Sequence, residues 1–106
     1  MRYNASRYNI RAMIKGFADA ETEEIWNGRR SRKLPNDIQA VALRKLRMLN
    51  QARTLVDLRV PPGNRLEALK GDRQGQHSIR INDQWRICFA LSEGGASGVA
   101  IVDDHG

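Results

Sequence analysis

Apolar residues at three- and four-residue spacing predict a long amphipathic helix in the first half of the chain. Its apolar positions are Ile38, Val41, Ala42, Leu46 and Leu49. We expect Asn36 to cap this helix and the helix to continue to Asn50. Arg44, Lys45 and Arg47 fall between these apolar positions in the sequence, so they are predicted to form the outer face of the helix.

A shorter helix is predicted over residues 19–26. Asp19 is a suitable N-cap, and three glutamates follow it in the first turns, where the helix dipole favours anions. Gly28 ends this helix, and the basic connector 29–33 leads to Pro35 ahead of the long helix. The two helices are therefore expected to form a hairpin.

Short apolar segments separated by turn sequences predict strands. The segment 12–17, AMIKGF, is the first of them. Four more are predicted at residues 65–69, 76–81, 85–91 and 98–103, with turns at Gly71-Asp72, Asn82-Asp83 and Gly94-Gly95. The resulting order, β-α-α-β-β-β-β, predicts an α+β fold in which the helical hairpin packs on a mostly antiparallel sheet.

The turn at Asn82-Asp83 allows two registers for the strands on either side. A two-residue loop would set Ile79 across from Arg86, whereas a three-residue loop ending at Gln84 sets apolar residues across from each other. The pairs in the second register are Ile81 with Trp85, Ile79 with Ile87 and His77 with Phe89. We predict the second register because it gives one consistent apolar face.

This register places Arg80 across from Arg86 on the other face of the sheet. Like charges at opposed positions destabilise a sheet, so two arginines in this arrangement indicate a bound anion such as a phosphate. The alternative is that both side chains extend into water or meet an acid such as Asp72 or Asp103.

The composition fits one folded domain. The 106 residues are 41% hydrophobic, and no apolar run approaches the roughly 18 residues that span a bilayer. Residues 1–12 lack the apolar core of a secretory signal and are interpreted as a leader or disordered arm, with 13–106 as the domain and the cytoplasm as its compartment. The single cysteine, Cys88, excludes an intrachain disulfide and is predicted to lie in the core.

The net charge of +6 suggests an anionic partner. Most of this charge comes from residues 28–53, which hold eight basic residues and one acid, Asp37. The concentration indicates a basic patch, with a solvated helix face as the alternative.

The chain resembles the HigB branch of the RelE/ParE toxin superfamily. The resemblance is carried by residues 61–89, PPGNRLEALKGDRQGQHSIRINDQWRICF, and extends to IVDDH at residues 101–105 and MIKGF at residues 13–17. The succession of Leu-x-x-Leu-Lys-Gly-Asp-Arg, a Trp-Arg-Ile hairpin and a terminal Asp-x-His is not a general pattern. The resemblance covers residues 13–105 and implies a RelE-like fold.

The resemblance also implies the toxin of a type II toxin–antitoxin system, which enters the ribosomal A site and cleaves mRNA there. The 2′-hydroxyl of the transcript attacks the adjacent phosphate, which requires a proton acceptor, cations that stabilise the phosphorane and a proton donor for the leaving oxygen. No cofactor and no metal are expected, since His77 and His105 are the only histidines and no metal-ligand cluster is visible.

Three residues match the catalytic positions of the family. Arg86 follows the hairpin tryptophan and is expected to stabilise the phosphate, because a guanidinium stays charged and fits phosphate oxygens. His105 matches the terminal histidine, whose imidazole changes charge near neutral pH and suits a general acid or base. Glu67 stands where some relatives carry a histidine and is a candidate general base. For Glu67 and His105, an ordinary surface position or a frayed chain end is the alternative.

Basic residues are the candidates for holding RNA. The resemblance places some of them on a strand and loop that line the same concave face as Arg86, and the hairpin and the long helix supply the others. The set is Arg65, Lys70 and Arg73 from the strand and loop, Arg80 from the hairpin, and Arg44 and Arg47 from the helix.

Two positions depart from the family pattern. Asp104 replaces a tyrosine of the Asp-Tyr-His motif, and Leu91 replaces a tryptophan common in close relatives. An aromatic ring can stack on an RNA base, which contributes roughly 1–3 kcal/mol, whereas a carboxylate repels phosphates. We therefore expect weakened cleavage. The alternatives are a protein that binds the ribosome or RNA and inhibits translation or ribosome maturation without cleavage, and a ParE-like gyrase poison.

The partners implied by the resemblance are a HigA-like helix-turn-helix antitoxin, the ribosome and mRNA. No membrane partner is expected. A basic single domain of this size is predicted to be monomeric when it is free of antitoxin.

Overall fold

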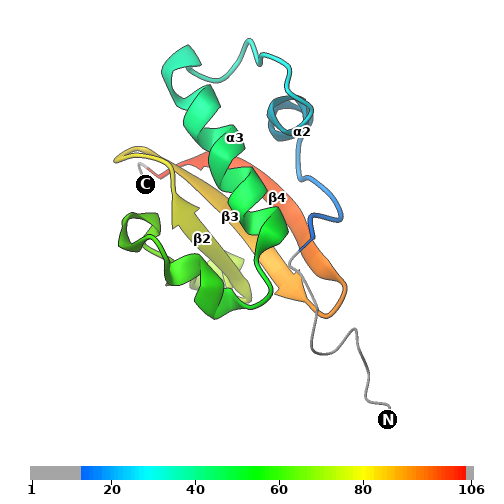
Figure 1. Cartoon of the computed structure of the whole chain (residues 1–106), viewed down its shortest axis with the longest axis vertical. Coiled ribbons are helices and arrows are strands. Elements are labelled where there is room, and N and C mark those ends of the chain that lie inside the picture. The colour runs from blue at the N-terminus through cyan, green and yellow to red at the C-terminus, as the bar shows by residue number, and fades with distance from the viewer. Residues whose placement is uncertain (1–12, 105–106) are drawn as a thin grey trace.

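Two helices cover one face of a four-stranded antiparallel sheet in the computed structural model, which describes residues 13–104 (Figure 1). The helices are α2 (Ala20–Trp26) and α3 (Asn36–Gln51). The strands are β1 (Glu67–Ala68), β2 (Gln76–Arg80), β3 (Trp85–Ser92) and β4 (Gly95–Asp103), in the spatial order β1-β2-β3-β4. The predicted α+β fold is confirmed. The predicted leader, residues 1–12, lies outside the described residues.

Helix α2 begins as its sequence predicts. The Asp19 side chain accepts a hydrogen bond from the Thr22 backbone N–H at 2.7 Å, which satisfies one of the free donors of the first helical turn. The Thr22 hydroxyl in turn accepts a hydrogen bond from the Ile101 N–H at 2.9 Å. The first turn of α2 is therefore tied directly to β4.

Helix α3 differs from its prediction in two details. The N-cap is Pro35, and Asn36 is already helical, because Pro35 holds the extended backbone that precedes a helix. Lys45, predicted on the outer face, is only 7% exposed. Its ammonium group donates a hydrogen bond to the side-chain oxygen of Asn64, 19 residues further along the chain. The spacing of residues within the helix contains no sign of that contact.

The segment predicted as a strand at residues 12–17 is not a regular strand. It forms two isolated parallel bridges to β4, Ile14 with Ala96 and Phe17 with Val99. The Ala96 N–H donates to the Met13 carbonyl at 2.8 Å, and a Cβ on Gly95 would lie 2.2 Å from that oxygen. This close approach requires glycine at the start of β4.

The connections around β1 contain three short 3-10 helices that the sequence did not predict. They are η1 (Leu55–Arg59), η2 (Pro62–Asn64) and η3 (Gly71–Arg73). Strand β1 is shorter than the predicted 65–69, because Arg65 has a left-handed backbone conformation that no strand contains. Strand β4 begins at Gly95, three residues before the predicted start.

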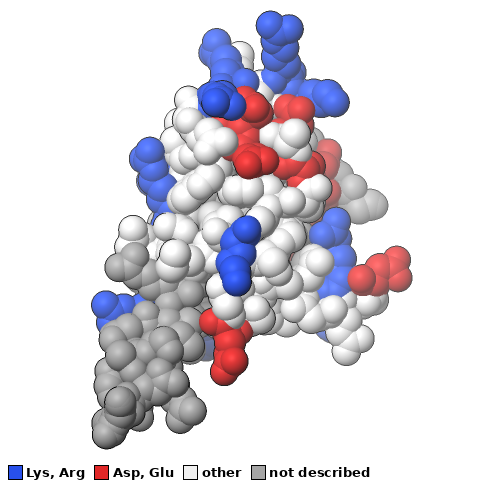
Figure 2. Space-filling model, turned by 90° about the vertical axis from the view of Figure 1, so that its right-hand side faces the viewer, with Lys and Arg blue, Asp and Glu red and all other residues white. Residues whose placement is uncertain are grey.

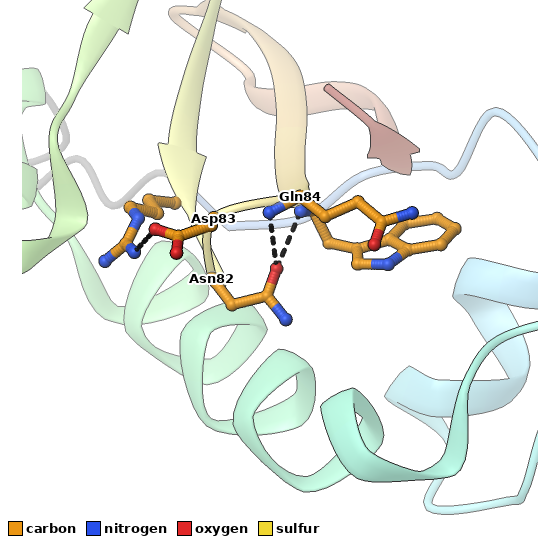
Figure 3. A network of polar contacts seen from close by, with 5 residues as sticks. Asn82, Asp83 and Gln84 are labelled. Carbon is orange, nitrogen blue, oxygen red and sulfur yellow. Dashed lines mark hydrogen bonds and ion pairs between the residues drawn. The ribbon is translucent and has the colours of Figure 1, made fainter. Parts of the chain in front are cut away.

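The hairpin between β2 and β3 has the predicted register. The observed pairs include His77 with Phe89, Ile79 with Ile87 and Arg80 with Arg86. The Ile81 N–H donates to the Trp85 carbonyl at 2.8 Å across the loop. The Asn82 side chain accepts from the backbone N–H groups of Gln84 and Trp85, both at 2.8 Å (Figure 3). These bonds stabilise the three-residue loop and therefore the register.

Alternation along the strands gives the sheet an apolar face below the helices and a polar face on the other side. The buried core includes Ile79, Ile87, Phe89 and Ile101 from the strands and Ala42, Leu46 and Leu49 from α3. The polar face carries Ser78 and Arg80 from β2 and Arg86 and Cys88 from β3. The candidate site lies on this polar face.

Candidate functional site

Arg86 is nearly buried on β3, with 6% of its surface exposed. Its Nε donates to the Ser78 hydroxyl at 2.7 Å, and its Nη2 donates to the Arg65 backbone carbonyl at 2.6 Å and to the Ser78 carbonyl at 3.4 Å. Oxygen atoms on two neighbouring segments therefore hold the guanidinium in one orientation. A cation held in this way loses little conformational freedom when it binds an anion.

Glu67 is the acidic partner of Arg86. Its Oε1 lies 3.6 Å from Arg86 Nη2, and its side chain is 56% exposed whereas that of Arg86 is 7% exposed. The sheet sets this position, because Glu67 on β1 pairs with Ser78 on β2, next to Cys88 on β3. The structure thus brings together two of the predicted catalytic residues, a buried cation and an accessible carboxylate.

Ser78 and the Arg65 carbonyl are parts of this site that the sequence analysis missed. Ser78 is fully buried and supplies both its hydroxyl and its carbonyl to Arg86. The predicted register could have found Ser78, since alternation places it on the same face as Arg80. The Arg65 carbonyl has no sequence signal, because its direction depends on the left-handed backbone of that residue.

Arg80 lies directly across from Arg86 and forms an ion pair with Asp83 in the hairpin loop (Figure 3). The two opposed arginines thus have separate acidic neighbours, Asp83 and Glu67. These two ion pairs reduce the repulsion between Arg80 and Arg86, for which the sequence analysis proposed a bound anion. The acid that meets Arg80 is therefore Asp83 in the loop of its own hairpin, and not Asp72 or Asp103 as the alternative proposed.

The other predicted RNA-binding residues near Arg86 lie on both sides of β1. Arg65 precedes it, and its side chain is exposed. Lys70 and Arg73 follow it at η3, where both are exposed and Arg73 donates to the Gln76 side chain at 3.1 Å. Their cationic groups are therefore accessible to solvent.

Cys88 is 3% exposed, so the prediction that it is buried is confirmed, and it lies on the polar face of the sheet, opposite Ser78. Burial raises the pKa of its thiol, while the positive charges of Arg73 and Arg86 lower that pKa and the negative charge of Asp104 raises it. These three charges therefore lie within electrostatic reach of Cys88.

The end of β4 is joined to the hairpin loop, since the Asp104 N–H donates to the Gln84 carbonyl at 2.6 Å. His105, the third predicted catalytic residue, follows Asp104 directly and lies outside the described residues. Within residues 13–104, no three His, Cys, Asp or Glu side chains come together as a metal site. No helix in that range has the length and apolar character needed to cross a membrane.

Folding separates the basic residues of the segment 28–53 from one another. Arg44 and Arg47 are exposed on α3, beside a shallow hollow that Met48 and Asp57 also line. Helix α3 covers the apolar face, so these two arginines lie across the sheet from Arg86. Figure 2 shows basic side chains at one end of the molecule, over the connector, next to the acidic side chains of α2. Lys45, which belongs to the same segment, is buried.

Comparisons with known proteins show which family the chain resembles. A family model described as the RelE-like toxin of type II toxin–antitoxin system HigB matches residues 15–105. The chain is 41% identical over 83 residues to a protein named Toxin HigB-1 from Vibrio cholerae serotype O1. The aligned segment covers 77% of this chain and 87% of that protein. It is also 39% identical over 57 residues to an uncharacterized protein of Haemophilus influenzae, and that alignment covers 54% of this chain and 56% of that protein. Since the family match spans both helices, the whole sheet and the Arg86 site, the chain belongs to the HigB-like family of RelE-like toxins of type II toxin–antitoxin systems.

Proposed function

We propose that this HigB-like toxin cleaves mRNA on the ribosome and that Arg86 stabilises the phosphate at the cleavage site. The observation that carries the proposal is the contact between Arg86 and Glu67, in which a buried guanidinium lies 3.6 Å from an exposed carboxylate. Membership of the HigB family suggests endoribonuclease activity in general, and the relative named Toxin HigB-1 supports a toxic role.

In the proposed reaction, a 2′-hydroxyl of the mRNA attacks the adjacent phosphorus, forms a 2′,3′-cyclic phosphate and expels the 5′-oxygen. Glu67 accepts the hydroxyl proton, since its carboxylate is exposed beside Arg86. Arg86 stabilises the additional negative charge on the phosphorane. His105 donates a proton to the leaving 5′-oxygen. None of these steps uses a cofactor or a metal ion.

The basic residues of the polar side are proposed to hold the transcript through its phosphates. Arg65, Lys70 and Arg73 lie on both sides of β1, and Arg80 lies across from Arg86. The remaining candidates, Arg44 and Arg47, are proposed to contact ribosomal RNA away from the cleavage site, because α3 lies across the sheet from Arg86.

The experiment is mRNA cleavage in a reconstituted translation reaction, mapped by primer extension with and without ribosomes. We expect cuts only with ribosomes and their loss in Arg86→Ala, with weaker cutting in His105→Ala. Arg29→Ala, at an exposed connector position, is the control and should keep the parent pattern. Cuts that persist unchanged in Arg86→Ala would reject the role of this residue.

A second candidate function is inhibition of translation or ribosome maturation without cleavage. Asp104 favours it, because a carboxylate repels the phosphates of RNA and cannot provide the roughly 1–3 kcal/mol of base stacking that an aromatic ring can. Asp104→Tyr should raise cleavage, and an unchanged rate would contradict this interpretation. Salt-sensitive ribosome binding without any cut product would favour the second function, whereas neither cuts nor binding would favour gyrase poisoning.

The family implies an antitoxin partner. We propose that the partner is a HigA-like helix-turn-helix protein, that the free toxin is a monomer and that it acts in the cytoplasm. Light scattering of the free toxin should give the mass of one chain, and a co-expressed antitoxin from the adjacent gene should co-elute with it. A dimeric mass for the free toxin would contradict the monomer.

A further inference from the structure

We propose that Asn64 is a positioning residue for Arg86, because it fixes the backbone of Arg65 so that the Arg65 carbonyl holds the guanidinium. This inference rests on the proposed role of Arg86 in cleavage. The contacts run from Lys45 on α3 to the Asn64 side chain, and from the next residue, Arg65, to Arg86.

The backbone of Arg65 requires support from its surroundings. Its φ is 45° and its ψ is 57°, and within residues 13–104 it is the only residue other than glycine with a positive φ. That conformation is disfavoured for a residue with a Cβ and persists where neighbouring groups impose it. The Arg65 carbonyl is 2.6 Å from Arg86 Nη2, closer than either Ser78 acceptor is to the guanidinium. The residue with the disfavoured backbone thus supplies the shortest hydrogen bond to the candidate catalytic cation.

Asn64 supplies this support through its side-chain amide. The residue is fully buried. Its Nδ2 donates to the carbonyls of Leu58 at 3.1 Å and Val60 at 3.4 Å, and its Oδ1 accepts from the Lys45 ammonium. Both ends of the amide are therefore bound by groups outside η2, which leaves Asn64, and the peptide that joins it to Arg65, little freedom to move.

Lys45 is buried to make this contact, with 7% of its surface exposed. Burial lowers the pKa of its ammonium, and the positive charges of Arg44 and Arg80 lower it further. A buried charge costs stability unless its partners compensate, and apolar residues of similar volume often replace such a pair without loss. The Lys45–Asn64 pair, which lies next to the left-handed Arg65, is therefore suited to positioning the Arg65 carbonyl more than to stabilising the fold.

Two variants and a control separate positioning from stability. Asn64→Leu removes the amide and leaves Lys45 without its acceptor, so both stability and cleavage should fall. Lys45→Met combined with Asn64→Leu replaces the pair by apolar groups, so the Tm should recover towards that of the parent. The matched control is Asn50→Leu on α3, which loses an amide that accepts from the Ile14 N–H at 2.9 Å.

The activity measurement is single-turnover mRNA cleavage on programmed ribosomes over a range of toxin concentrations. For the double variant we expect an unchanged half-saturating concentration and a maximal rate lower by about tenfold or more, since the RNA-binding groups remain while the guanidinium loses its orientation. Asn50→Leu should keep the maximal rate. A double variant with the parent's maximal rate would overturn the inference.

NMR of the Arg86 Nε–Hε group measures the positioning without any need for cleavage. The parent should show a resolved, slowly exchanging signal, assigned by its loss in Arg86→Lys. The double variant should shift this signal and speed its exchange, whereas Asn50→Leu should leave it in place. If the parent does not cleave mRNA and the signal still responds in this way, positioning stands and the proposed function fails. An unchanged signal in the double variant overturns the inference whatever the activity.

Discussion

Removal of the Ser78 hydroxyl should destabilise the fold through Arg86. The hydroxyl accepts from Arg86 Nε at 2.7 Å, and water has little access to either residue, since Ser78 is fully buried and Arg86 is 6% exposed. A hydrogen bond to a charged group contributes about 1.5–3 kcal/mol. We therefore expect Ser78→Ala to lower the free energy of unfolding by about 2 kcal/mol, or roughly 30-fold in the unfolding equilibrium constant.

The assay is urea denaturation followed by fluorescence of the two tryptophans. With an m-value of about 1–1.5 kcal/mol/M for a domain of this size, the midpoint should fall by roughly 1.3–2 M. Ser97→Ala, at an exposed position of β4, is the matched control and should change the free energy of unfolding by less than about 0.5 kcal/mol.

A double-mutant cycle with Arg86→Met assigns the loss to this hydrogen bond. In the Arg86→Met background, Ser78→Ala should cost less than about 0.5 kcal/mol, which leaves a coupling free energy of about 1.5 kcal/mol. An equal cost in both backgrounds would refute the reasoning, because Ser78 would then stabilise the fold independently of Arg86.

Glu67→Gln should leave the free energy of unfolding within about 1 kcal/mol of that of the parent, because an ion pair in which one partner is 56% exposed contributes little stability. The same substitution should slow mRNA cleavage on ribosomes. Urea denaturation and primer extension measure the two effects, and parent-level cleavage would remove Glu67 as the base. The Cys88 thiol should react slowly with a disulfide reagent in the folded protein and rapidly in urea, since burial raises its pKa and the thiolate is the reactive form; equal rates would contradict this. Because the pKa of Lys45 is lowered by folding, the unfolded state binds more protons between the folded pKa and 10.5. The stability of the parent relative to Lys45→Met should therefore rise with pH through that window, and a difference that does not change with pH by urea denaturation would contradict the prediction.

Local patterns were sufficient where the structure depends on residues close together in the chain. The Asp19 cap of α2 needs only the N–H three residues later. The register of the β2–β3 hairpin follows from alternation, because a shift of one residue would move Ile79 and Ile87 off the apolar face. The same alternation placed Arg86 on the polar face, where Glu67 meets it.

The sequence by itself therefore determined the α+β order, the hairpin register and the face on which Arg86 lies, since these depend on periodicity and on turns. Only the tertiary structure decided how Arg86 is held. The packing of η1 and η2 beside α3 joins Lys45 to Asn64 across 19 residues, and the Arg65 carbonyl reaches Arg86 across 21. No periodic pattern connects residues so far apart. Burial of a lysine and a left-handed arginine also oppose local preference, and they persist because the surrounding hydrogen bonds and packing together outweigh that cost.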